Sequence, residues 1–332
     1  MLLFNGFAAQ ASINKSELTQ IKKIVNELQK SRQQKNEKIH QHPNSYLLRK
    51  GYKYRKATNQ SFKGAYNPID QKPFFDIPVT YNSNVRAWIK YYQTRGRRWF
   101  KTRLERSYKY LPVMKKTLAK KGLPQDLAYI AMIESGFSAH ATSHAKAVGY
   151  WQFIPATAKR YGLHINWWID ERRDFLKSTL AAANYLGDLY KMFGSWYLTA
   201  AAYNMGENRL RRLIHKYKTY NFWKLADSDH LPQETSEYIP KMIASLLISK
   251  APKLYGFKHL NPLHPMSYEY IYVPGGTDLY NMSNYLQVDR AHLNRLNPDL
   301  IQGFVPGFVT YHRIRIPKGY NRKVASYIKT QL

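Results

Sequence analysis

The apolar run Leu127–Ile133 ends in a single carboxylate, Glu134, and this pattern limits what the chain can fold into. Pro124 and Asp126 precede the run, and both residue types are favoured in the first turn of a helix. Gly136 follows it and is well placed to end the helix, because glycine readily adopts left-handed backbone angles. The sequence therefore predicts a helix from residue 124 to residue 134, with Glu134 at its C-terminal end in an apolar setting.

Hydrophobic periodicity predicts a mainly α-helical domain around this helix. Apolar residues between positions 100 and 118 fall on one stripe of a helix, with Arg and Lys on the other faces. The stripe comprises Phe100, Leu104, Tyr108, Leu111, Met114 and Leu118. Further helices are predicted over Ser178–Phe193, Tyr197–Asn204, Asn208–Tyr217 and Glu234–Lys250, and residues 137–170 are predicted to form long functional loops.

The segment Arg86–Lys109 interleaves basic and aromatic side chains, a pattern that is also typical of platforms for single-stranded nucleic acid. An amphipathic core helix with a solvated basic face explains the same residues. We therefore expect no nucleic-acid partner for this segment.

The C-terminal part follows a different pattern and predicts a small β-α-α-β module over residues 266–320. A Pro-rich stretch, residues 261–265, separates it from the main domain, which is predicted over residues 75–255. The expected elements are a strand at Tyr268–Val273, helices at Asp278–Leu286 and Arg290–Leu296, and a strand at His312–Ile316.

The N-terminal residues 1–74 are predicted to lie outside these domains. Residues 1–11 are apolar and end in Ala9-Gln10-Ala11, which resembles the cleavage site of an export signal whose start is truncated. Residues 12–74 are polar and are expected to form a largely disordered arm, with one helix over Glu17–Lys30. No stretch of the sequence reaches the roughly 20 apolar residues that a transmembrane helix needs.

The net charge of +31 favours acidic partners: nucleic acid, anionic membrane faces or anionic polymers of the cell envelope. Cysteine is absent, which excludes disulfides, thiolate zinc sites and cysteine-linked lipid anchors on these residues.

Glu134 stands alone, because no Asp or Glu occurs between positions 135 and 169. Most glycosidases use a facing pair of carboxylates, so a lone one suggests a group that is acid first and base second. A helix C-terminus and apolar neighbours both raise a carboxyl pKa, which a general acid needs near neutral pH. The alternative is a solvent-exposed glutamate at a helix end.

Several motifs around Glu134 occur in a fixed order. Glu134-Ser135-Gly136-Phe137 is followed by Ala141-Thr142-Ser143 and by Gly149-Tyr150-Trp151-Gln152-Phe153; Ala201-Ala202-Tyr203-Asn204-Met205-Gly206 and Leu231-Pro232-Gln233-Glu234-Thr235 come later, before Tyr238-Ile239-Pro240. In this order they closely resemble glycoside hydrolase family 23, the lytic transglycosylases whose fold is related to goose-type lysozyme. The run Ile169–Asp174 (IDERRD) points to one branch of that family.

The resemblance implies a role for each matching residue. It identifies Glu134 as the single catalytic acid and base, and Tyr238 as the tyrosine that orients its carboxylate. It implies that five further residues contact or line the path of the glycan: Ser143, Gln152, Tyr203, Asn204 and Glu234. The aromatic pair Tyr150-Trp151 departs from the usual family pattern; it either stacks on a sugar ring or packs the loop.

The implied reaction cleaves the β-1,4 bond between N-acetylmuramic acid and N-acetylglucosamine of peptidoglycan and leaves a 1,6-anhydro end, without a cofactor or a metal. It implies an exported, periplasmic or envelope-located monomer with peptidoglycan strands as its partner. The alternatives are a goose-type muramidase that uses water, or a non-catalytic basic protein that binds peptidoglycan or nucleic acid.

His140 and His144 have the i, i+4 spacing of a helical metal site, but no third ligand follows, so we expect surface histidines.

The C-terminal module resembles a degenerate LysM repeat, with Gly276-Thr277-Asp278 in place of the usual Gly-Asp-Thr. It is either a glycan-binding module or a structural appendage.

Overall fold

The computed structural model describes residues 75–331. The predictions for residues 1–11 and 12–74, including the helix Glu17–Lys30, lie outside the described residues. The larger part consists of α3 (Ser83–Gln93), α4 (Arg97–Lys120), the 3₁₀ helix η2 (Gln125–Ala128), α5 (Tyr129–Glu134), α6 (Pro155–Arg160), the 3₁₀ helix η3 (Glu171–Arg173), α7 (Phe175–Phe193), α8 (Trp196–Met205), α9 (Glu207–Tyr217), α10 (Phe222–Asp227) and α11 (Gln233–Lys250).

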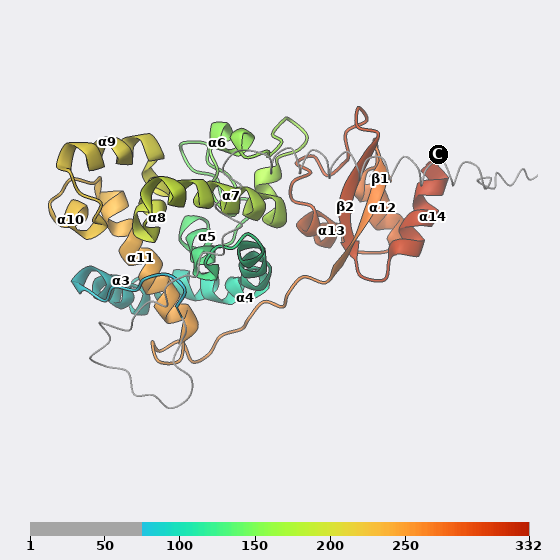
Figure 1. Cartoon of the computed structure of the whole chain (residues 1–332). Coiled ribbons are helices and arrows are strands. Elements are labelled where there is room, and N and C mark those ends of the chain that lie inside the picture. The colour runs from blue at the N-terminus through green and yellow to red at the C-terminus, as the bar shows by residue number, and fades with distance from the viewer. Residues whose placement is uncertain (1–74, 332) are drawn as a thin grey trace, which may run out of the picture. The chain divides into compact units, whose positions relative to one another are not determined.

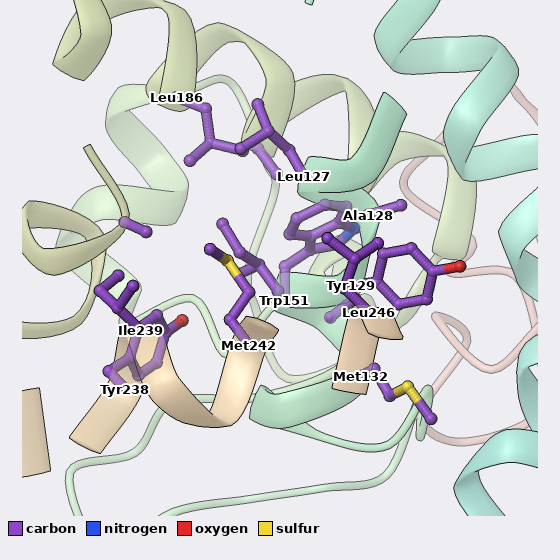
Figure 2. Packing of buried hydrophobic residues seen from close by; sticks show 14 of the residues in the cluster. Leu127, Ala128, Tyr129, Met132, Trp151, Leu186, Tyr238, Ile239, Met242 and Leu246 are labelled. Carbon is purple, nitrogen blue, oxygen red and sulfur yellow. The ribbon is translucent and has the colours of Figure 1, made fainter. Parts of the chain in front are cut away.

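The short helix α5 lies at the centre of this helical part, among α4, α7, α8 and α11 (Figure 1). Its residues Tyr129 to Met132 are buried because the run is apolar on every side. Figure 2 shows Tyr238, Met242 and Leu246 of α11 packed beside this run and beside Trp151. The predicted mainly helical fold is confirmed, and its core surrounds the helix that carries Glu134.

The predicted helix around Glu134 forms in two pieces. Residues 125–128 adopt the tighter 3₁₀ geometry, and the α-helix runs only from Tyr129 to Glu134. Asp126 does more than complement the helix dipole. It is buried, and its carboxylate pairs with Lys250 of α11 at 2.7 Å. Gly136 has a φ of +59°, as expected for a residue that ends a helix.

The amphipathic stripe of α4 is largely as predicted, with one error. Phe100, Leu104, Met114 and Leu118 are buried, but Tyr108 is exposed and Tyr110 is buried instead. Positions 108 and 110 flank the stripe on opposite sides, so a modest rotation of the buried face favours one over the other.

The basic face of α4 was predicted to be solvated, and this is only partly correct. Two of its arginines lie against the turn after Glu134. The Nη1 of Arg106 donates to the carbonyl of Gly136 at 3.0 Å. The side chain of Arg103 packs against Gly136 and lies over the ring of Trp99 at 3.3 Å. Burial lowers the pKa of Arg103 to about 10.

The later predicted helices are confirmed with small shifts at their ends, as α7, α8, α9 and α11. Helix α7 begins three residues earlier than expected, since the carboxylate of Asp174 accepts hydrogen bonds from the N–H groups of Leu176 and Lys177. The short helices α6 and α10 were not predicted individually, because short segments carry little periodicity. Helix α3 overlaps the segment Arg86–Lys109, which was assigned as a whole to an amphipathic core helix.

The C-terminal part has the predicted order of two strands and two helices. It consists of β1 (Tyr268–Pro274), α12 (Leu279–Leu286), α13 (Arg290–Leu296), β2 (Tyr311–Pro317) and an unpredicted final helix, α14 (Asn321–Gln331). The strands pair antiparallel, with Ile271 opposite Ile314. Val273, Ile314 and Ile316 pack with α12, α13 and α14 in a second hydrophobic cluster.

Charged side chains join the C-terminal part to the helical part, and the described residues belong to one compact unit. Arg315 of β2 and Asp174 before α7 are 3% and 2% exposed, and their side chains pair at 2.7 Å. Lys177 of α7 adds a second pair with Asp299 at 3.4 Å. Buried charges of this kind require their partners, so the contact depends on both parts.

Among residues 75–331, none of the helices combines the length and the apolar character that crossing a membrane requires.

Candidate active site

Glu134 is the last residue of α5, and its carboxyl group faces a residue of α11. The hydroxyl of Tyr238 donates a hydrogen bond to Oε1 of Glu134 at 2.5 Å. Tyr238 itself is buried, with 5% of its surface exposed. The structure therefore brings together the two residues that the sequence analysis assigned as the acid and its orienting partner.

The surroundings of Glu134 favour its protonated form. Burial is the largest effect, and it raises the pKa of Glu134 from 4.5 to about 7. The hydrogen bond from Tyr238 acts in the opposite direction, because it stabilises the carboxylate and lowers this pKa. The negative charge of Glu234 raises the pKa further. A carboxyl group with a pKa near neutrality can both donate and accept a proton at physiological pH.

The same burial acts on the two tyrosines of the site. It raises the pKa values of Tyr203 and Tyr238 well above their ordinary value, and the nearby Glu134 raises both further. Both hydroxyl groups consequently remain protonated at neutral pH and can act as hydrogen-bond donors.

Asn204 and Glu234 form a second pair at the site, on α8 and α11. The amide Nδ2 of Asn204 donates to the carboxylate of Glu234 at 3.2 Å. Its Oδ1 accepts a hydrogen bond from the hydroxyl of Thr235 at 2.7 Å, which fixes the orientation of the amide. Glu234 is exposed, one helical turn before Tyr238 on α11, so its carboxylate is accessible to a ligand.

Gln152 lies in a loop that its own side chain stabilises. Its Nε2 donates to the carbonyl groups of Ala141 and Gly149 at 3.1 and 3.0 Å. Gln152 also adopts a φ of +49°, which is uncommon for residues other than glycine. Such a conformation persists only where the surroundings hold it, so this loop is tightly constrained.

Ser143 is exposed, and its hydroxyl accepts a hydrogen bond from the N–H of Ala147 at 3.1 Å. Its role in the structure is to close the turn between residues 143 and 147. No contact in the described part of the chain joins Ser143 or Gln152 directly to Glu134, so their predicted contacts with glycan remain predictions.

The aromatic pair Tyr150-Trp151 packs the loop and does not present its rings to a ligand. Tyr150 and Trp151 are 2% and 0% exposed. The indole Nε1 of Trp151 donates to the hydroxyl of Thr179, and the Trp151 carbonyl accepts from Tyr203 at 2.7 Å. Tyr203 is therefore tied to the loop that carries Gln152.

Several residues of the site lay outside the sequence-based predictions. The hydroxyl of Ser135 donates to the carbonyl of Tyr150 at 2.8 Å, which attaches the loop to the residue after Glu134. Thr235 orients Asn204, and Arg106 holds Gly136. Ser135 and Thr235 lie within the quoted motifs, so the motifs contained the signal; no local pattern pointed to Arg106.

His140 and His144 are exposed and lie outside the helices. His140 contacts Arg173 at 3.2 Å, and no cluster of three or more potential metal ligands occurs within residues 75–331. A cavity of about 430 Å³ lies beside His140, and none of the predicted site residues lines it. Its lining is formed by His140, Arg173, Arg290, Ala291, Asn294, Arg295, Asn297, Pro298, Leu300, Ile301, Gln302 and Gly303.

Residues 112–226 match the Transglycosylase SLT domain family. The matched segment contains Glu134, Ser143, Gln152, Tyr203 and Asn204, while Glu234 and Tyr238 follow it. The predicted resemblance to the lytic transglycosylases is thereby confirmed at the level of this domain.

Two curated proteins illustrate the similarity. Membrane-bound lytic murein transglycosylase D of Escherichia coli (strain K12) is 45% identical over 144 residues, which cover 42% of this chain and 31% of that protein. A protein of Alteromonas sp. (strain M-1), named for tributyltin chloride resistance, is 42% identical over 121 residues, covering 36% of this chain and 58% of that protein. The chain thus spans about a third of the length of the first relative.

Among solved structures, the 70 kDa soluble lytic transglycosylase of Escherichia coli is 21% identical, with a TM-score of 0.40. The superposition covers 51% of this chain and 30% of that one.

Proposed function

We propose that this protein is a lytic transglycosylase that cleaves the glycan strands of peptidoglycan. The observation that carries the proposal is a single half-buried carboxyl group, Glu134, which has a pKa raised to about 7 and is held by the hydroxyl of Tyr238. The match of residues 112–226 to the Transglycosylase SLT domain supports the substrate class.

The reaction begins with protonated Glu134. Its proton passes to the glycosidic oxygen between N-acetylmuramic acid and N-acetylglucosamine while the bond from that oxygen to C1 breaks. We assign no second carboxylate to the chemistry, because Glu234, whose charge acts on Glu134, is engaged by the amide of Asn204. The carbonyl oxygen of the substrate's own N-acetyl group instead bonds to C1 and takes up the positive charge.

Glu134 acts as a base in the second step. Its carboxylate takes the proton of the muramyl C6 hydroxyl, the C6 oxygen bonds to C1, and the N-acetyl oxygen leaves. The product carries a 1,6-anhydro end and Glu134 is protonated again, so no water is consumed and the reaction is a lyase reaction. The hydrogen bond from Tyr238 holds the carboxylate in place during both proton transfers.

The remaining site residues bind the glycan or hold the loop that binds it. Asn204 and Glu234 offer an amide and a carboxylate to sugar hydroxyl and N-acetyl groups, and Gln152 and Ser143 act from the loop. Tyr203 acts indirectly, because its hydroxyl is engaged with the Trp151 carbonyl. We assign these residues to substrate binding and Glu134 alone to proton transfer.

We also propose the domain division predicted from the sequence. It places a transglycosylase domain over residues 75–255 and a LysM-like module over residues 266–320. The order of two strands and two helices supports the second assignment. An exported location in the periplasm or envelope follows from the substrate. The charge of +31 favours the anionic polymers found there.

Mass spectrometry of purified murein digested by the protein tests the reaction. Muropeptides with 1,6-anhydro ends are expected, whereas reducing muramyl ends alone would identify a muramidase that uses water. A Glu134→Gln variant that lyses murein as well as the wild type would instead indicate a binding protein without catalysis at this site.

A further inference from the structure

The acidic and basic run Ile169–Asp174 has no part in the proposed chemistry, although it is prominent in the sequence. The structure places three of its charged side chains in the interior: Asp174 pairs with Arg315, and the other two, Asp170 and Arg172, are 3% and 6% exposed. Charged residues are rarely buried to this extent unless they are paired. These two residues therefore need a structural explanation.

Arg172 joins Asp170 to both ends of the loop that carries Gln152. Its Nε and Nη2 donate to the Asp170 carboxylate at 2.9 and 2.8 Å, in a two-point ion pair. Its Nη1 donates to the carbonyl groups of Lys146 and Phe153 at 2.9 and 3.1 Å. We call residues 146–153 the glycan loop, since it lies between these two carbonyl groups and contains Gln152.

The glycan loop also lies directly against the backbone of η3. A Cβ atom at Gly149 would be 2.0 Å from the carbonyl oxygen of Arg172, and Gly149 has a φ of +82°. Only glycine fits at this position, because both the approach and the backbone angle exclude a side chain. The side chain and the backbone of Arg172 thus contact the same loop.

On its other side the glycan loop is joined to the catalytic centre. The Tyr150 carbonyl accepts from Ser135, the neighbour of Glu134, and the Trp151 carbonyl accepts from Tyr203. A displacement of the loop away from Arg172 would therefore move groups that contact the site.

The C-terminal part holds the opposite side of the Asp170 segment. The N–H of Asp170 donates to the carbonyl of Asp299 at 2.9 Å, and the N–H of Ile301 donates to the carbonyl of Trp168 at 2.9 Å. The segment is thus fixed between residues 299–301 and the glycan loop.

We propose that Arg172 is a positioning residue for the reaction: with Asp170, it sets the position of the glycan loop, and the C-terminal part stabilises that arrangement. The inference rests on the proposed function, because it assigns the loop to glycan binding. The planar guanidinium is required, since a lysine in its place cannot donate to the carboxylate and to two carbonyl groups in the same geometry.

Two glycine substitutions test the contact with a matched control. Gly149→Ala introduces the clash with Arg172, whereas Gly162→Ala has the same φ of +82° and no atom within 4 Å of the added Cβ. Both variants share the backbone strain, and only the first displaces the glycan loop. We expect Gly149→Ala to raise the KM for soluble glycan strands by about tenfold or more, and Gly162→Ala to leave it unchanged.

Arg172→Lys tests the side chain without a change at the loop itself. It should raise KM more than it lowers kcat, and the acidity of Glu134, read from the pH profile, should stay as in the wild type. A purely structural role would lower the thermal midpoint and the active fraction without a change in KM. The proposal is wrong if Gly149→Ala and Arg172→Lys both keep the wild-type KM.

A double-mutant cycle with Gln152→Ala tests whether Arg172 changes KM through the glycan loop. If Arg172 acts through the glycan loop, the changes in KM from Arg172→Lys and Gln152→Ala should be non-additive; strict additivity would overturn the proposal. Failure of the proposed function would look different, because the wild-type protein would then produce no anhydro-muropeptides in the same assay.

Discussion

Tyr238 and Glu134, which are separated by 104 residues in the sequence, share a hydrogen bond of 2.5 Å between the tyrosine hydroxyl and Oε1 of the carboxyl group. The bond joins the N-terminal part of α11 to the last residue of α5. It holds the carboxyl group in one orientation, while burial raises the pKa of that group to about 7.

The rate of glycan cleavage should fall as the pH rises through about 7, the pKa of Glu134. The general acid must be protonated in the free enzyme, so kcat/KM is highest below this pKa and declines above it. A pH profile of kcat/KM on soluble glycan strands measures this decline, which forms the descending limb of the profile. A profile that stays flat between pH 5 and 9 would show that Glu134 is not the acid.

Tyr238→Phe should shift this descending limb to higher pH. The lost hydrogen bond stabilised the ionised carboxylate, so its removal raises the pKa of Glu134. The rate below the limb should also fall about tenfold or more, because the carboxyl group loses its orienting partner. Tyr197→Phe is the control, since the hydroxyl of Tyr197 on α8 contacts Thr80 at 3.0 Å and not Glu134. A shift to lower pH in Tyr238→Phe would contradict the assignment.

Glu234→Gln should move the limb in the opposite direction. The negative charge of Glu234 raises the pKa of Glu134, so its neutralisation lowers that pKa and the activity declines at a lower pH. Glu237→Gln is the matched control on the same helix, where Glu237 pairs with Lys241 at 3.1 Å. If both variants shift the limb equally, the effect reflects net charge and not the position of Glu234.

Glu134→Gln should be inactive and yet more stable than the wild type at pH 8. The pKa of Glu134 is about 7 in the folded protein and near its ordinary 4.5 in the unfolded chain. The wild type therefore loses stability as the pH rises from 4.5 through 7, and glutamine, which does not ionise, avoids this loss. Thermal midpoints should differ at pH 8 and coincide near pH 4. Equal midpoints at both pH values would argue against a raised pKa of the Glu134 carboxyl group.

Arg315→Leu should lower the free energy of unfolding by about 3–5 kcal/mol, because it leaves the buried carboxylate of Asp174 without its partner. Denaturant unfolding measures the change. Arg295→Gln, which removes an exposed ion pair with Asp289, should leave stability unchanged. A small effect at Arg315 would mean that the C-terminal part is only loosely attached.

Local patterns were sufficient for much of the fold. The helices α7, α8, α9 and α11 and the strands β1 and β2 could be predicted, because each repeats its apolar residues with its own period. The same signal was too weak for short helices and for the rotation of α4, where Tyr110 is buried in place of Tyr108.

By itself the sequence determined that Glu134 ends an apolar helix and that its motifs follow in the order of the lytic transglycosylases. The resemblance also pointed to Tyr238 as its partner, and the tertiary structure gave the contact. Only the tertiary structure decided the rest: Glu234 as the charge that raises the pKa of Glu134, and Arg172 beside the glycan loop. The physical reason is that periodicity and capping act between neighbours in the chain. Burial and pairing instead depend on groups that approach one another only when the helices pack.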